Sequence, residues 1–252
     1  MKVTMLGTGT STGVPQVGCT CEVCTSTDFR DKRLRCSALV ETRDVRILLD
    51  CSPDFREQML RISFQPFDAV LLTHEHYDHV GGLDDLRPFC TFGEVNVYTE
   101  PYCAEHLEER IPYCFSKQKY PGVPQINLIR INPYQCFDIG DAHIVPIRVM
   151  HGSLPILGFR INDFAYITDM KTTDEEACAH LKNLKCLVVN GLRHEPHKSH
   201  QTIEEAVAFV RRLEVPQAYL IHMGHHAGLH RESGKLLPDN IHFAYDGLSV
   251  KF

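Results

Sequence analysis

The sequence has no surplus of basic residues and no long apolar run. Lys and Arg number 26 against 32 Asp and Glu, so the formal net charge is −6 and the pI is near 6.2. Binding of nucleic acid by unspecific phosphate neutralisation needs clustered positive charge, which argues against a nucleic-acid partner unless a local basic patch forms. No apolar stretch approaches the ~18 residues of a membrane span, and the N-terminal apolar segment is too short for a signal peptide. These absences predict a soluble, cytoplasmic protein with no membrane partner.

The sequence also has no Gly/Ser-rich linker, internal repeat or low-complexity tract. Its 252 residues, 43% of them hydrophobic, are enough for one large core, and we predict a single domain over residues 1–252. Strand-like stretches alternate with a few helical ones, which is typical of two sheets sandwiched between helices. The predicted fold class is therefore α/β with a layered architecture.

Local signals place several elements. Ser52 as N-cap and Pro53 at the first helical position predict a helix to about Arg61. The pattern predicts further helices over residues 81–89, 173–181 and 202–213. The stretches 241–245 and 248–252 flank Asp246-Gly247 and predict a hairpin. The segment 100–125, rich in Tyr and Pro, is expected to be either a lid or surface structure.

The sharpest signal is a run of histidine and acidic residues directly after an apolar strand over residues 69–73. His74, His76, Asp78 and His79 place four metal-ligand side chains within six residues. Because alternate residues share a side in extended backbone, His74 and His76 can face one ion while Asp78 and His79 face a second. The alternative is a polar surface loop with incidental histidines, but this spacing at a strand end favours a dinuclear metal site.

Three later residues each follow a predicted strand in the same way: His151, Asp169 and His222. Any one alone is more typical of a structural or surface residue. Their repeated placement at strand ends, where α/β folds carry their chemistry, makes them the candidates for the remaining ligands.

Eleven cysteines are present, and Cys19, Cys21 and Cys24 are clustered in a long loop over about residues 7–35. This spacing can surround three sides of a tetrahedral Zn²⁺, and His225 is the candidate fourth ligand, with His226 as the weaker substitute. The alternative is a redox-active or incidental cysteine pair, which would leave the loop without an anchor. The scattered cysteines are expected to be small buried hydrophobic residues.

Taken in order, His74-x-His76-x-Asp78-His79, His151, Asp169 and His222 resemble the signature of the metallo-β-lactamase superfamily. The resemblance implies a four-layer αββα sandwich. It also implies that His74, His76 and His151 bind one metal ion, that Asp78, His79 and His222 bind the other, and that Asp169 bridges both. Asp50 would orient the ligand histidines from behind. Nitrogen and oxygen ligands suit Zn²⁺, Mn²⁺ or Fe²⁺.

The cysteine loop with His225, the stretch Gly7–Pro15 and the stretch Asp50–Arg56 are similar to the PhnP-like phosphoribosyl cyclic phosphodiesterases, and also to PqqB-like proteins. This resemblance implies a small, cyclic ribose phosphodiester as substrate, hydrolysed by a metal-activated water, and a homodimer. His200 matches an extra histidine of this branch and is the predicted general acid; the alternative is a surface residue at a helix start. With Asp78, His200 makes up the predicted catalytic pair.

Two further residues are weaker candidates for the substrate site. His197 is close enough to share or replace the role of His200, and Arg193 has the planar donor pattern that binds phosphate. Two other functions stay open: an RNA-processing nuclease of the tRNase Z type, and a non-catalytic PqqB-like protein that binds a metabolite.

Overall fold

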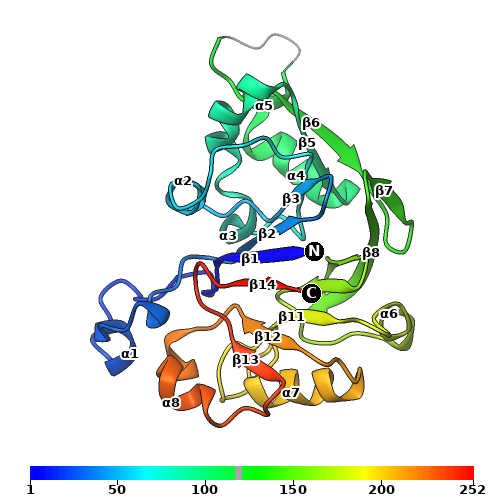
Figure 1. Cartoon of the computed structure of the whole chain (residues 1–252). Helices are drawn as coiled ribbons and strands as arrows, with labels where there is room; N and C mark the ends of the chain where they lie inside the picture. Colours follow the sequence, from blue (N-terminus) through cyan, green and yellow to red (C-terminus); the bar gives the residue numbers. More distant parts are fainter. Residues whose placement is uncertain (117–120) are drawn as a thin grey trace.

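Two seven-stranded sheets packed face to face form the centre of the molecule (Figure 1). The computed structural model describes residues 1–116 and 121–252. The first sheet has the order β14 (Ser249–Lys251), β1 (Lys2–Gly7), β2 (Ser37–Glu41), β3 (Arg46–Leu49), β4 (Ala69–Leu71), β5 (Val95–Thr99) and β6 (Ile126–Arg130). The second has the order β13 (Ile241–Phe243), β12 (Ala218–Ile221), β11 (Cys186–Asn190), β10 (Phe164–Ile167), β9 (Leu154–Ile161), β8 (Ala142–His151) and β7 (Phe137–Ile139).

Helices cover the outer face of each sheet. The first sheet carries α2 (Phe55–Met59), α3 (Tyr77–Val80), the 3₁₀ helix η2 (Leu83–Phe92), α4 (Pro101–Arg110) and α5 (Pro112–Phe115). The second carries α6 (Glu175–His180) and α7 (Ile203–Arg212), with α8 (His230–Gly234) beside β13. One apolar core lies between the sheets and one more under each helical layer. The predicted αββα sandwich is confirmed.

The helix α7 shows how local sequence defines an element. The Thr202 hydroxyl accepts from the backbone N–H of Glu205, and the Glu205 carboxylate accepts from the N–H of Thr202, which forms a capping box. Four apolar residues at helical spacing then face the second sheet: Ile203, Ala206, Phe209 and Val210.

Two helix predictions were wrong in detail. The helix α2 begins at Phe55, because Ser52 and Pro53 form a turn in which the Ser52 carbonyl accepts from the Phe55 N–H at 2.9 Å. Gly82 lies against this turn so closely that a Cβ there would be 2.1 Å from the Ser52 carbonyl oxygen. The predicted helix over residues 81–89 is the 3₁₀ helix η2, which contains Pro88.

The predicted C-terminal hairpin is also wrong. β13 pairs with β12 in the second sheet, whereas β14 pairs with β1 in the first. The turn at Asp246-Gly247 does form, with Gly247 at φ 91°, but it carries the chain from one sheet to the other. The Asp246 carboxylate holds this turn by accepting from the Thr8 hydroxyl at 2.8 Å and from the Leu34 N–H at 2.7 Å.

The cysteine-bearing loop projects beside β1 and contains α1 (Glu22–Thr25) and η1 (Phe29–Asp31) (Figure 1). Two backbone hydrogen bonds of 3.1 Å fix the base of this loop beside the strand end that carries His222. The Thr10 N–H donates to the Met223 carbonyl oxygen, and the Met223 N–H donates to the Thr8 carbonyl oxygen. Across the described ranges, none of the helices is long and apolar enough to span a membrane.

Candidate metal centre

The site lies where strands of both sheets end. The run from His74 to His79 follows β4 and Asp50 follows β3, whereas His151 ends β8, Asp169 follows β10 and His222 follows β12. The first sheet thus supplies four of the seven candidate ligands of the dinuclear site, and the second sheet supplies three. All seven ligands that the sequence predicts for the dinuclear site are brought together here.

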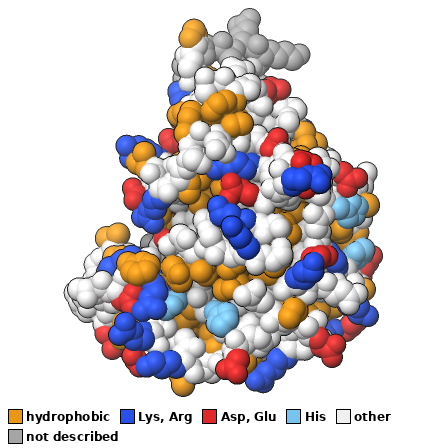
Figure 2. All heavy atoms as spheres, viewed as in Figure 1, with side chains coloured by type: hydrophobic (Ala, Val, Ile, Leu, Met, Phe, Trp, Pro, Cys, Tyr) orange, Lys and Arg blue, Asp and Glu red, His pale blue; other side chains and the backbone are white. Residues whose placement is uncertain are grey.

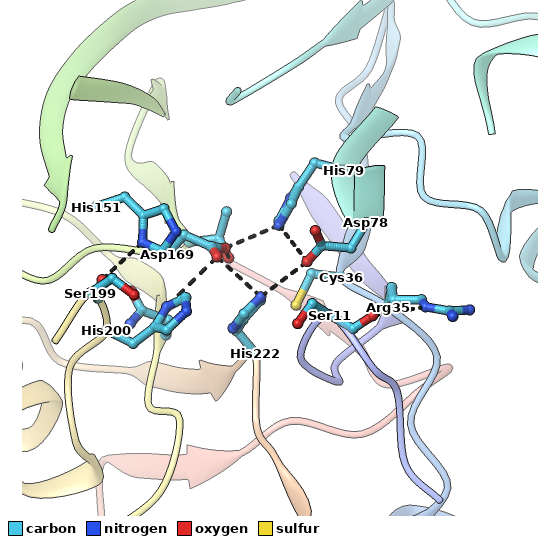
Figure 3. A network of polar contacts seen from close by, with 12 residues as sticks. Ser11, Arg35, Cys36, Asp78, His79, His151, Asp169, Ser199, His200 and His222 are labelled. Atoms are coloured by element: carbon cyan, nitrogen blue, oxygen red, sulfur yellow. Dashed lines mark hydrogen bonds and ion pairs between the residues drawn. The ribbon is translucent and has the colours of Figure 1, made fainter. Parts of the chain in front are cut away.

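Three site residues have left-handed backbone conformations. Asp50, Asp169 and His222 each have φ of 56° within two residues of the end of their strands. A residue with a side chain rarely adopts this conformation, and Asp and His tolerate it better than bulky residues do. Such strain concentrates at functional sites, and here the side chains of Asp169 and His222 point toward each other (Figure 3).

His74, His76 and His151 form the first donor group. Their ring centroids are 4.5 Å (His74–His76), 5.7 Å (His74–His151) and 5.2 Å (His76–His151) apart. One nitrogen from each ring lies within 4.8 Å of the others, a spacing that suits a single cation.

Asp78, His79, Asp169 and His222 form the second donor group (Figure 3). The His79 Nε2 lies 3.3 Å from an Asp78 oxygen and 3.1 Å from an Asp169 oxygen. The His222 Nε2 lies 3.5 Å from Asp78 and 3.1 Å from Asp169. Asp169 also lies within 4.8 Å of a His151 nitrogen, so its carboxylate stands between the two groups.

The electrostatics of the second donor group are those of a cation site. Burial acts to raise the pKa of Asp169, but the neighbouring His222 and His79 outweigh it and hold the pKa well below the usual range. Asp78 behaves in the same way, with His79 as the main cause of the lowered pKa. Both carboxylates are therefore ionised within a buried cluster.

The residues present fit a pair of metal ions. Among the described residues, the buried polar atoms without a hydrogen-bond partner include the Nε2 atoms of His74, His79 and His222. An unsatisfied buried polar group costs about 1–3 kcal/mol, so a cluster of such atoms needs another partner. Imidazole nitrogens and carboxylate oxygens are a donor set that Zn²⁺, Mn²⁺ and Fe²⁺ accept.

Asp50 lies behind both groups, fully buried. Its Oδ2 accepts from the His79 Nδ1 at 2.8 Å, and its Oδ1 accepts from the Thr73 backbone N–H at 2.9 Å. The Thr73 hydroxyl lies 3.0 Å from Oδ1 and 3.0 Å from the His74 Nδ1. The sequence reasoning missed Thr73, because a threonine at the end of a strand is an ordinary β-branched strand residue.

His200 lies at the edge of the cluster, only 8% exposed. Its Nδ1 is 3.7 Å from an Asp169 oxygen, and its ring centroid is 4.6 Å from that of His151 and 4.8 Å from that of His222. Burial, followed by the neighbouring His222, lowers the pKa of His200 to about 3. An anion bound beside it would raise this pKa, because an opposite charge favours the protonated form.

The two weaker candidates differ in position. The His197 ring centroid is 4.9 Å from that of His200, so His197 belongs to the rim of the site. The guanidinium of Arg193 donates to the carbonyls of Glu195 (3.3 Å) and Pro196 (3.4 Å), which holds it within its own loop. A contact between Arg193 and a substrate stays a prediction.

The cysteine loop forms a separate donor group with His225. The His225 Nδ1 lies 3.1 Å from the sulfur of Cys19, 3.4 Å from that of Cys21 and 3.5 Å from that of Cys24. The backbone N–H of Cys24 is the main cause that lowers the pKa of Cys21 to about 6, which favours its thiolate. Three sulfurs and one imidazole nitrogen converge as in structural zinc sites.

The segment 100–125 folds largely into α4 and α5, and its residues 117–120 lie outside the described part of the chain. Both ends of α4 contact parts of the chain near the metal centre. Glu100 forms a bidentate ion pair with Arg148 of β8, with one N···O distance of 2.7 Å. Arg110 donates to the Glu75 carbonyl oxygen at 2.9 Å, between the first two histidines.

Comparison with known proteins places this fold and site. The model of the beta-lactamase superfamily domain matches residues 45–223, so the chain belongs to the metallo-β-lactamase superfamily, most of whose members are hydrolases. Within it, the chain is similar to a diphosphatase from the PhnP family, with 35% identity, a TM-score of 0.92, and coverage of 100% of this chain and 96% of that one.

Two further relatives are informative. Zn²⁺-bound PqqB from Methylobacterium extorquens shares the fold at 20% identity and a TM-score of 0.81, with 100% of both chains covered. An octanoyltransferase from Porphyromonas gingivalis strain W83 is 49% identical over 252 residues, which are 99% of this chain and 51% of that protein. The chain therefore spans about half the length of this relative.

Proposed function

We propose that this protein is a metal-dependent hydrolase that cleaves a phosphorus–oxygen bond in a small phosphodiester, with a cyclic ribose phosphate as the preferred candidate. The observation that carries the proposal is the position of His200 beside the two donor groups, 3.7 Å from the carboxylate that stands between them. The 35% identity over the full length with a PhnP-family diphosphatase supports phosphorus chemistry, and it adds a diphosphate bond to the substrates worth testing.

In this proposal, seven residues bind the metal ions and His200 donates a proton. His74, His76 and His151 would hold one divalent ion and Asp78, His79 and His222 a second, with Asp169 between them. When bound, two such ions activate water and neutralise the charge of a phosphodiester. Because His200 lies at the edge of this cluster, an anionic substrate beside it raises its pKa, and the protonated ring then donates to the departing alkoxide.

The experiment that tests the proposal compares the wild type with Asp78→Ala. Bound metals are measured, and activity is assayed on bis(p-nitrophenyl) phosphate, a ribose cyclic phosphate, a nucleoside diphosphate, a phosphomonoester and an octanoyl thioester. Asp239→Ala, an exposed acid between α8 and β13, is the matched control. We expect metal-dependent diesterase activity that Asp78→Ala abolishes and Asp239→Ala retains.

The other outcomes overturn the proposal in distinguishable ways. Activity confined to the thioester would favour acyl chemistry, which the name of the P. gingivalis relative raises as the second candidate class. A metal-loaded protein that is inert on every substrate would favour a PqqB-like metabolite-binding protein.

An RNA-processing nuclease is the third candidate. The net charge of −6 disfavours it, and on the face seen in Figure 2 basic and acidic side chains are interspersed. RNA cleavage that is strong at low salt and lost at high salt would support this candidate.

The resemblance to the PhnP-like branch leads us to propose a homodimer as well. Sedimentation of the purified chain tests this proposal.

A further inference from the structure

One buried carboxylate contacts a ligand histidine from each donor group. Asp50 is fully buried, and its Oδ2 lies 2.8 Å from the Nδ1 of His79, a member of the second group. On its other side the Thr73 hydroxyl lies 3.0 Å from Oδ1 and 3.1 Å from Oδ2. The same hydroxyl lies 3.0 Å from the Nδ1 of His74, a member of the first group.

The direction of these hydrogen bonds follows from counting protons. A threonine hydroxyl has one proton to donate, and a carboxylate can only accept. The Thr73 hydroxyl therefore donates to Asp50, and it accepts from His74, whose proton must then be on Nδ1. The Nε2 of His74 is left with a free lone pair, and this atom is buried without a hydrogen-bond partner among the described residues.

We propose that Thr73 is a positioning residue that fixes the ring orientation and tautomer of His74, so that Asp50 orders one ligand of each metal site, directly in one case and through Thr73 in the other. The proposal rests on the two metal sites of the proposed function. It predicts that the Thr73 hydroxyl matters for the first site and not for the second.

Thr73 is well suited to this task because its backbone N–H, its carbonyl and its hydroxyl each make a hydrogen bond. Its backbone N–H donates to Asp50, and its carbonyl accepts at 3.0 Å from the N–H of Leu157 in the second sheet. The side chain is 1% exposed, so water does not compete for the hydroxyl.

The test compares two variants of the full-length chain, Thr73→Val, which keeps the shape and removes the hydroxyl, and Thr73→Ser, which keeps the hydroxyl. Each metal-free protein is titrated with Co²⁺, and binding is followed by absorption and calorimetry. Loss of a partner that orients a metal ligand typically costs 10- to 100-fold in metal affinity. Of the two Co²⁺ ions at the His/Asp donor groups, we expect Thr73→Val to bind one as the wild type does and the other about 10- to 100-fold more weakly. Binding of Co²⁺ at the separate cysteine loop should not change, and Thr73→Ser should match the wild type.

Three results would overturn the proposal: wild-type affinity at both sites of Thr73→Val, equal weakening of both sites, or a Thr73→Ser variant as weak as Thr73→Val. A second measurement needs no variant and covers the case in which Thr73→Val does not fold. In the metal-free wild type labelled with ¹⁵N in its histidines, long-range ¹H–¹⁵N spectra should show His74 protonated on Nδ1. Protonation on Nε2 would contradict the proposal.

Failure of the proposed function is distinguishable from failure of this inference. A protein that is inert on phosphodiesters, yet shows the site-selective loss of Co²⁺ in Thr73→Val, would refute the former and uphold the latter.

Discussion

The Nδ1 of His151 lies 2.9 Å from the carbonyl oxygen of Ser199, to which it donates a hydrogen bond. This contact joins the end of β8 to the loop that carries His200. Gly152 packs against the same loop, since a Cβ there would lie 3.3 Å from the Cβ of Ser199. A ligand of the first donor group and the proposed acid are thus held in a fixed relation.

Replacing His200 should separate catalysis from metal binding. We expect His200→Gln to lower kcat by about 10²- to 10⁴-fold, the usual contribution of a positioned acid, because the variant has no group that can protonate the leaving alkoxide. Steady-state kinetics and metal analysis of the same samples test this, with unchanged metal content expected. His194→Gln is the matched control, since His194 is paired with Glu204 on the surface. Unchanged turnover in His200→Gln would rule out the assignment.

The cysteine loop should depend on its own metal ion. Cys21→Ser removes the thiol whose pKa is lowered to about 6, and we expect the purified variant to lack one equivalent of zinc. Without that anchor, residues 7–35 should be cut faster by protease than in the wild type. Cys136→Ser, an exposed cysteine outside the loop, should change neither property. A Cys21→Ser protein with full zinc content would show that the loop holds no zinc.

Asp246 should make stability depend on pH. Burial raises its pKa from 3.8 to about 6, so the folded protein holds this proton more tightly than the unfolded chain does. The resulting stabilisation is complete below about pH 4 and is lost as the pH rises through about 6. A shift of this size corresponds to at most about 3 kcal/mol.

The measurement is urea unfolding of the wild type and Asp246→Asn at pH 4 and pH 7. Asparagine does not titrate, so between these pH values the wild type should lose stability relative to the variant. Asparagine also replaces one of the two oxygens that accept from Thr8 and Leu34, and that cost is present at both pH values. A difference that does not change with pH would contradict the prediction.

The capping box of α7 should contribute measurably to stability. Thr202→Ala removes the acceptor of the Glu205 N–H, and such a change costs about 1 kcal/mol of unfolding free energy. Thr202→Ser keeps the hydroxyl and should lie close to the wild type. Equal stability of the alanine and serine variants in chemical unfolding would show that the Thr202 hydroxyl does not contribute to the free energy of unfolding.

The candidate ligands could be predicted from sequence because their signal is chemical and local. His74 to His79 combine unusual residue types with a spacing that few structural roles need, and His151, Asp169 and His222 repeat the placement at strand ends. The same holds for α7, where the cap and the apolar periodicity agree. In these cases, the signal for the ligand or the helix lies in residues that are neighbours in the sequence.

The sequence-based predictions failed where contacts between distant parts of the chain determine the local structure. The turn at Asp246-Gly247 forms as expected, but which strand accepts β14 depends on β1, more than 200 residues away in the chain. Gly82 lies close against the turn at Ser52 that precedes α2, and nothing near Ser52 in the sequence reveals this contact. Thr73 is similar, since its contacts with Asp50 and His74 arise only when β3 and β4 pair.

The chain passes from the first sheet to the second between β6 and β7, and returns between β13 and β14. A cut in the connection at residues 131–136 would therefore give two fragments that each hold part of every donor group. His74, His76, Asp78, His79 and the three loop cysteines would be on one fragment, and His151, Asp169, His222 and His225 on the other. The second fragment would also bring β14, the strand that completes the sheet of the first. Each donor group would therefore be complete only when the two fragments associate.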